Sequence, residues 1–143
     1  MNSQDIDIYR QSGILPYKLV DGDIFLLLIT SRKGNRWIIP KGIVEPHLTP
    51  AESASREAFE EAGIEGDISS ESIGQYTHDK WGGTCTITVF PMEVKKEFDD
   101  WPEHSVRKRQ WFLLEEALER IDSPVLKDYI SEFARGLSNR SKR

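Results

Sequence analysis

Three glutamates stand close together in the stretch SREAFEEAGI, which runs from Ser55 to Ile64. Glu57 precedes Glu60 by three residues and Glu61 by four, so a helix would place the three carboxylates in one sector. Like charges at these spacings repel weakly, and the carboxyl-terminal half of a helix disfavours anions. A divalent cation would reverse the repulsion, because Mg²⁺ takes carboxylate oxygens as ligands. The spacing therefore indicates either a metal site or a solvated acidic surface.

The helix that carries these glutamates has clear boundaries in the sequence. Thr49 and Glu52 form a capping box, with Pro50 at the first helical position. Gly63 is the residue type that ends a helix in left-handed geometry. We therefore expect a helix over about residues 50 to 62. Its alanines fall on one narrow face that can approach a sheet closely, and the glutamates point elsewhere.

Apolar runs and turn residues predict the remaining elements. The expected strands cover residues 14–20, 24–30, 37–39, 73–78, 84–94 and 110–114. Two more helices are expected at 113–121 and at about 123–137, the second capped by Ser123 and ending before Gly136. Hairpins outnumber βαβ units in this order, so an α/β fold with a mixed sheet is expected. A chain of 143 residues fits one domain, 1–143, in which 138–143 would form a flexible tail.

Composition and charge argue against several classes of protein. The formal net charge of −5 argues against general nucleic-acid binding. The longest apolar run, 24–29, is too short to cross a bilayer, and the first residues resemble no signal segment, so we expect a cytoplasmic protein without a membrane partner. The single cysteine, Cys85, excludes an intramolecular disulfide and is expected to be a strand residue. Oligomeric state is left open.

The longer stretch PKGIVEPHLTPAESASREAFEEAGI resembles the Nudix box, a motif written as G, five residues, E, seven residues and REUxEExGU, where U is aliphatic. Two positions depart from it: Leu48 stands at the first glutamate, and Ile43 stands where a second glycine is frequent. Glu45, in the same loop, is a candidate to replace the missing glutamate. The matching residues, over 42–64, are Gly42, Arg56, Glu57, Ala58 as a weak aliphatic, Glu60, Glu61, Gly63 and Ile64.

The resemblance implies a Nudix-type α/β/α sandwich with a mixed β-sheet, in which the box forms a loop and helix. It implies an enzyme that cleaves a pyrophosphate bond with Mg²⁺ or Mn²⁺ as cofactor. Glu57 and Glu61 would be metal ligands together with the main-chain carbonyl of Lys41, and Glu60 would be a third ligand or bind through water. Arg56 would hold a glutamate in place. Either Glu61 or Glu60 would be the general base, and the sequence does not choose between them.

Two segments outside the box, 31–42 and 99–112, are similar to the subfamily that hydrolyses diphosphoinositol polyphosphates and diadenosine polyphosphates. This similarity implies that basic residues bind the substrate phosphates. The candidates for substrate binding are Arg10, Lys18, Arg32, Lys33, Arg36, Lys108 and Arg109, together with Gly42.

Several alternatives stay open at this point. Trp101 is either a stacking platform for an adenine or a local packing anchor. Glu103 is either a solvated charge, a distal metal ligand or an alternative base. The substrate is alternatively another nucleoside diphosphate derivative or the 5′ triphosphate of RNA. A protein of another class, a non-catalytic Nudix-fold binding module, is the further alternative.

Overall fold

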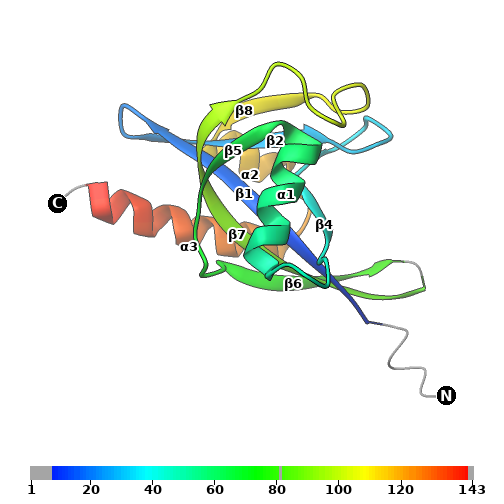
Figure 1. The fold of residues 1–143 in the computed structure, drawn as a ribbon. Helices are drawn as coiled ribbons and strands as arrows, with labels where there is room; N and C mark the ends of the chain where they lie inside the picture. The colour runs from blue at the N-terminus through cyan, green and yellow to red at the C-terminus, as the bar shows by residue number, and fades with distance from the viewer. Residues whose placement is uncertain (1–7, 81, 142–143) are drawn as a thin grey trace.

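The computed structural model describes residues 8–80 and 82–141, and in this part a mixed sheet lies between helices (Figure 1). The helices are α1 (Pro50–Ala62), α2 (Leu114–Arg120) and α3 (Pro124–Ser141). The strands are β1 (Ile8–Val20), β2 (Asp23–Thr30), β3 (Trp37–Ile38), β4 (Lys41–Ile43), β5 (Ile64–Ile68), β6 (Gly74–Lys80), β7 (Gly83–Glu97) and β8 (Arg109–Leu113).

The central strand β1 organises the sheet. One of its edges pairs in parallel with β7 over residues 8–17. The other edge pairs with β2 at residues 17–20 and with β4 at residues 11–13, both antiparallel. The pairing between β1 and β2 ends at Tyr17 and Leu26. Past that point β1 pairs with β4 at residues 11–13, and β2 pairs with β3 at residues 29–30. This arrangement confirms the predicted mixed sheet. It also holds β4, which contains Gly42 at the start of the box, beside residues 11–13 of β1.

Both faces of the sheet are buried, because adjacent residues of β1 contribute to different hydrophobic cores. Ile14 packs with Ala54, Ala58 and Ala62 of α1. The next residue, Leu15, belongs to the core that includes residues of α2 and α3. Small side chains on α1 allow the helix axis to lie close to the strands. Figure 1 shows α1 and α3 on opposite sides of the sheet, which is the predicted sandwich.

The structure confirms the predicted bounds of α1 and corrects those of other elements. The strands β4 and β5 were not expected, because runs as short as KGI and IEGDI lack a recognisable alternation. The last helix does not end before Gly136 but continues to Ser141. Gly136 is tolerated inside the helix since Leu137, one residue later, is buried in the core. The helix thus takes up most of the predicted flexible tail, whose residues 142–143 lie outside the described part.

The structure also bears on the single cysteine and on membrane-spanning helices. Cys85 lies in a strand, β7, as predicted, and the structure adds that it is buried in the core. No helix in the described part of the chain has the length and apolar character needed to cross a membrane.

Candidate active site

The box folds as the strand β4, a loop and the helix α1. The hydroxyl of Thr49 accepts a hydrogen bond from the backbone N–H of Glu52 at 3.1 Å, and the Glu52 carboxylate accepts one from the N–H of Thr49 at 2.8 Å. Gly63 ends the helix with φ = 66°. Local sequence thus fixes both ends of α1, and with them the direction in which its glutamates project.

Glu57 lies against the backbone of Gly42. A Cβ atom added to Gly42 would collide with the Glu57 carboxylate. The pKa of Glu57 is raised from 4.5 to about 7, chiefly by burial and then by the neighbouring carboxylates of Glu61, Glu60 and Glu103, in that order of effect. The protein therefore holds a half-buried carboxylate at a place that favours its neutral form unless a positive charge is bound nearby.

Glu61 is more deeply buried, with 8% of its surface exposed. Its Oε1 accepts a hydrogen bond from the backbone N–H of Lys41 at 3.0 Å, and its Oε2 lies 3.5 Å from a guanidinium nitrogen of Arg107. Burial raises the pKa of Glu61, while the Lys41 N–H and the Arg107 charge oppose that rise. The carboxylate is thus held between β4 and the loop that precedes β8.

Glu60 faces outward and pairs with Arg56. The Arg56 Nε lies 3.0 Å from the Glu60 Oε1, and this hydrogen bond raises the pKa of the guanidinium. Arg56 therefore holds a glutamate, and that glutamate is Glu60.

Arg107 is a site residue that the sequence analysis did not single out. Only 6% of its side chain is exposed, and its guanidinium pairs with Glu103 at 3.0 Å and donates to the carbonyl of Thr30 at 2.9 Å. Glu103 also pairs with Arg32 at 3.4 Å, so it is not a free solvated charge. The basic run 107–109 was visible in the sequence, but nothing in that run marks Arg107 as the buried member.

Lys33 and its basic neighbours line a cavity of about 680 Å³, which we call the cationic cavity. The cavity brings three predicted phosphate-binding residues, Arg32, Lys33 and Arg36, together with the box. Its lining is Gln11, Ser31, Arg32, Lys33, Asn35, Arg36, Ile38, Lys41, Gly42, Ile43, Glu61 and Arg107.

Gln11 is a second residue that the sequence analysis missed. It is 5% exposed, and its Oε1 has no hydrogen-bond partner in the described part of the protein. A buried polar atom without a partner is costly, and such atoms are retained where a ligand or bound water uses them. No signal in the sequence marked Gln11, because it precedes the predicted strand 14–20, whereas β1 begins at Ile8.

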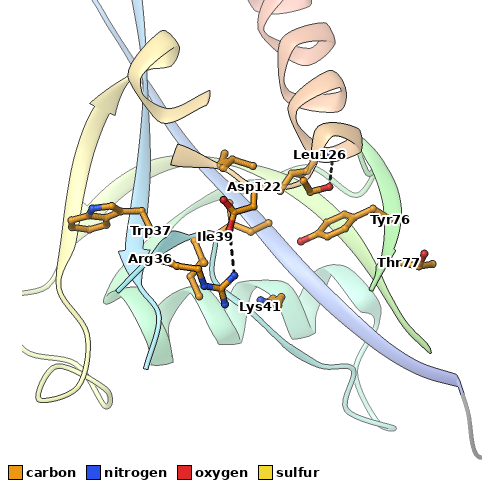
Figure 2. A pocket seen from close by; sticks show the side chains of 11 residues that line it. Arg36, Trp37, Ile39, Lys41, Tyr76, Thr77, Asp122 and Leu126 are labelled. Atoms are coloured by element: carbon orange, nitrogen blue, oxygen red, sulfur yellow. Dashed lines mark hydrogen bonds and ion pairs between the residues drawn. The ribbon is translucent and has the colours of Figure 1, made fainter. Parts of the chain in front are cut away.

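A smaller cavity of about 280 Å³, the inner cavity, adjoins the cationic cavity and shares Arg36, Ile38 and Lys41 with it. Figure 2 shows Tyr76 of β6 and the ion pair between Arg36 and Asp122 around this cavity. Burial raises the pKa of Tyr76 to about 12, so its hydroxyl stays neutral. The inner cavity is lined by Arg36, Trp37, Ile38, Ile39, Lys41, Tyr76, Thr77, Ile121, Asp122, Ser123 and Leu126.

Arg109, a predicted phosphate-binding residue, has a structural role. Its guanidinium donates to the carbonyls of Ala62 at 2.8 Å, Gly63 at 3.1 Å and Phe98 at 2.6 Å. It also lies 4.1 Å from the ring centre of Trp101. These contacts satisfy carbonyls at the end of α1, where a positive charge is favoured by the helix dipole. The structure therefore gives Arg109 a role in the fold that its assignment to substrate binding did not include, and it does not line the cationic cavity.

Trp101 is a packing anchor, which was one of its two predicted interpretations. Its ring is nearly buried, and its Nε1 donates to the carbonyl of Glu61 at 3.0 Å. The neighbouring backbone N–H of Glu103 donates to the carbonyl of Glu60 at 3.0 Å. The loop before β8 thus caps the end of α1 and brings Arg107 and Glu103 to the glutamates.

Three other predicted basic residues lie outside the cationic cavity. The Lys18 ammonium lies 4.2 Å from the ring centre of Trp111. At ~3.3 Å per strand residue, the backbone of Lys18 is about 23 Å from that of Gln11 along β1. The structure therefore does not bring Lys18 to the site. Arg10 is exposed, with its carbonyl bonded to the Val44 N–H of the box loop at 3.1 Å, and Lys108 is exposed beside Thr30.

The donor set at Glu57 and Glu61 fits a divalent cation, although within residues 8–80 and 82–141 no three His, Cys, Asp or Glu side chains are already grouped as a ligand set. Hard cations prefer carboxylate oxygens. Both carboxylates are buried enough for the pKa of each to rise, and a cation would offset this. Gly42 leaves the space that the Glu57 carboxylate needs.

The structure thus combines a mixed sheet between helices with a cavity that has basic walls and is lined by Glu61 of the acidic helix. The model of the NUDIX domain matches residues 12–133. The chain belongs to the Nudix hydrolase family, and it is a pyrophosphohydrolase of the acid anhydride hydrolase class. Nudix hydrolases generally use divalent metal ions.

Sequence similarity to other proteins covers most of the chain. It is 34% identical to "Nudix hydrolase 16, mitochondrial" from Arabidopsis thaliana, covering 85% of this chain and 77% of that protein. It is 33% identical to "Diphosphoinositol polyphosphate phosphohydrolase 3-beta" from Bos taurus, covering 89% of this chain and 79% of that one. The fold matches a C. elegans Ap4A hydrolase binary complex with a TM-score of 0.79 and 23% identity, over 92% of this chain and 98% of the other.

Proposed function

We propose that this Nudix hydrolase uses Mg²⁺ or Mn²⁺ to cleave a pyrophosphate bond in a polyphosphorylated small molecule. The observation that carries the proposal is the cationic cavity, which places Arg32, Lys33 and Arg36 beside Glu61. An acidic protein gathers five cationic side chains there, since Lys41 and Arg107 line the same cavity, and such a lining suits several phosphate groups rather than one.

Different residues of the site bind the substrate phosphates and the cation. Arg32, Lys33 and Arg36 bind the phosphates of the substrate. Glu57 and Glu61 hold the cation, with the backbone of Lys41 beside them. A bound divalent cation supplies neutralisation of phosphoryl oxygens and activation of water. Arg107 holds the Glu61 carboxylate toward the cavity at 3.5 Å.

The reaction is a hydrolysis that needs no other reactant. The oxygen of a water molecule attacks one phosphorus of the pyrophosphate, and the bond from that phosphorus to the bridging oxygen breaks. Either Glu61 or Glu60 accepts the proton of the water. Two phosphate-bearing products leave the site.

The inner cavity favours a dinucleoside polyphosphate as the first candidate substrate. Trp37, Tyr76 and Leu126 give this cavity aromatic and aliphatic walls beside the cationic cavity. A nucleoside attached to a polyphosphate chain matches this pair of cavities, because its base is planar and uncharged. A diphosphoinositol polyphosphate is the second candidate, since it carries many phosphates for Arg32 and Lys33.

A hydrolysis panel tests the proposal. Purified protein is incubated with Mg²⁺ or Mn²⁺ and diadenosine tetraphosphate, a diphosphoinositol polyphosphate, a nucleotide sugar or a 5′-triphosphate RNA, and the products are identified. We expect the greatest kcat/KM with diadenosine tetraphosphate. Preference for the nucleotide sugar or the RNA would overturn the proposed substrate class.

The variant Glu61→Gln tests the metal site. It should abolish metal-dependent turnover while its circular dichroism spectrum stays that of the folded protein. The exposed Glu65→Gln variant removes the same charge from β5 and serves as the control. Full activity of Glu61→Gln would overturn the assignment of the site.

A further inference from the structure

Arg36 lies at the junction of the two cavities and is held there by an acidic residue. It lines both the cationic and the inner cavity. Its Nη1 lies 3.5 Å from the Oδ2 of Asp122, which lies in the connection between α2 and α3 (Figure 2). The two residues are 86 positions apart in the chain, so the fold alone brings them together.

The ion pair can be opened at little cost. The side chains of Arg36 and Asp122 are 59% and 75% exposed, and exposed pairs contribute little to stability. A phosphate group offers a guanidinium more charge and a bidentate geometry. Substrate phosphates can therefore displace Asp122 from Arg36.

Asp122 is also placed to repel phosphates from the inner cavity. In the described part of the chain, the carboxylates that line these cavities are Glu61 in the cationic cavity and Asp122 in the inner one. Arg36 and Lys41 line both cavities, whereas Arg32, Lys33 and Arg107 line only the cationic one, which is therefore the more positive of the two. The charge distribution therefore directs a polyphosphate toward Arg32 and Lys33 and leaves the inner cavity for an uncharged group.

We propose that Asp122 is a specificity-determining residue that competes with substrate phosphates for Arg36 and excludes phosphates from the inner cavity. This inference rests on the proposed function of the same site. The ion pair with Asp122 lowers the affinity of the substrate-free protein for polyanions below the affinity that its basic residues alone would give.

The test measures binding of inorganic tripolyphosphate to the metal-free protein by titration calorimetry in EDTA. This measurement needs no turnover, so failure of the inference is distinguishable from failure of the proposed hydrolase activity. Asp122→Asn should tighten tripolyphosphate binding by about 2- to 5-fold, the scale of one exposed ion pair. Unchanged or weaker binding by a folded Asp122→Asn protein would overturn the proposal.

Two further variants separate the pair from general charge effects. Glu132→Gln removes one negative charge from an exposed position of α3 and should leave tripolyphosphate binding unchanged. Introduced together with Arg36→Gln, the Asp122→Asn substitution should lose most of its effect, because the two residues act through their contact. An equal gain with and without Arg36 would show that Asp122 acts only through the general potential and would overturn the competition.

The same variant should change substrate choice in the panel described above. Asp122→Asn should lower the KM of a diphosphoinositol polyphosphate more than that of diadenosine tetraphosphate, because the group that the latter would place in the inner cavity is an uncharged base. An identical change in both KM values would contradict the exclusion of phosphates from that cavity.

Discussion

Gly42 and the carboxylate of Glu57 share one small space, since a Cβ atom at position 42 would overlap that carboxylate. The glycine is therefore needed for a close approach between β4 and the side chain of α1. It thereby positions a predicted metal ligand.

The Gly42→Ala substitution should displace Glu57 and lower kcat/KM by about 100-fold, as expected when a catalytic group moves by an ångström. Mn²⁺ affinity, measured by titration of the metal-free protein, should fall as well. The control is Gly136→Ala in α3, where an added Cβ meets nothing. That variant should keep its activity and gain about 0.5 to 1 kcal/mol in free energy of unfolding. Normal Mn²⁺ affinity in Gly42→Ala would contradict the role of the glycine.

The stability of the metal-free protein should fall as pH rises through the window set by Glu57. Its pKa is about 7 in the folded protein against 4.5 as the ordinary value. Between these values the folded state binds more protons than the unfolded state, so deprotonation favours unfolding. Burial of Glu61 acts in the same direction.

Thermal unfolding in EDTA at about pH 5.5 and about pH 8 measures this effect. The difference in Tm should shrink in Glu57→Gln and persist in the exposed Glu65→Gln. Addition of Mg²⁺ at the higher pH should raise the Tm of the unaltered protein, because ligands that bind the folded state stabilise it. A Glu57→Gln protein with the full pH dependence would exclude Glu57 as its source.

Replacement of Arg109 by methionine should destabilise the protein and leave substrate binding intact. The guanidinium donates to three carbonyls around the end of α1, so its loss should cost about 2 to 3 kcal/mol in free energy of unfolding. Arg32→Met should instead raise KM with little loss of stability, because the Arg32 side chain in its ion pair with Glu103 is 67% exposed. Urea denaturation and steady-state kinetics distinguish the two arginines. A raised KM in folded Arg109→Met would restore it as a phosphate-binding residue.

The Gln11→Leu substitution should stabilise the fold and weaken substrate binding. Leucine has a similar size and removes the buried Oε1 that has no partner among the described residues, so the free energy of unfolding should rise by about 1 kcal/mol. Because Gln11 lines the cationic cavity, KM should rise in the same variant. Ser12→Ala is a useful comparison, since it removes a hydrogen bond of 2.7 Å to the Pro50 carbonyl on the other face of β1 and should destabilise the protein. An unchanged KM in Gln11→Leu would contradict a role of Gln11 in substrate binding.

The acidic helix was predictable because its signals are local. Thr49, Glu52 and Gly63 act within a turn of the residues that they cap, so the sequence sufficed to place both ends of α1. The spacing of Glu57 and Glu61 likewise follows from helix geometry. The prediction that Gly136 ends the last helix was wrong because a nonlocal contact, the burial of Leu137, outweighs the low helix propensity of glycine.

The sequence by itself determined the capped helix, the mixed α/β class and the residues able to bind metal and phosphate, since these depend on residue types and short spacings. Only the tertiary structure decided which basic residues line the cavity beside Glu61. It turned Arg107 inward to Glu61 and Arg109 toward the end of α1, although the two lie two residues apart. It also placed Arg36 against Asp122 across 86 positions. Such pairings depend on which strands and loops become neighbours when the sheet forms, and residue spacing along the chain does not encode that choice directly.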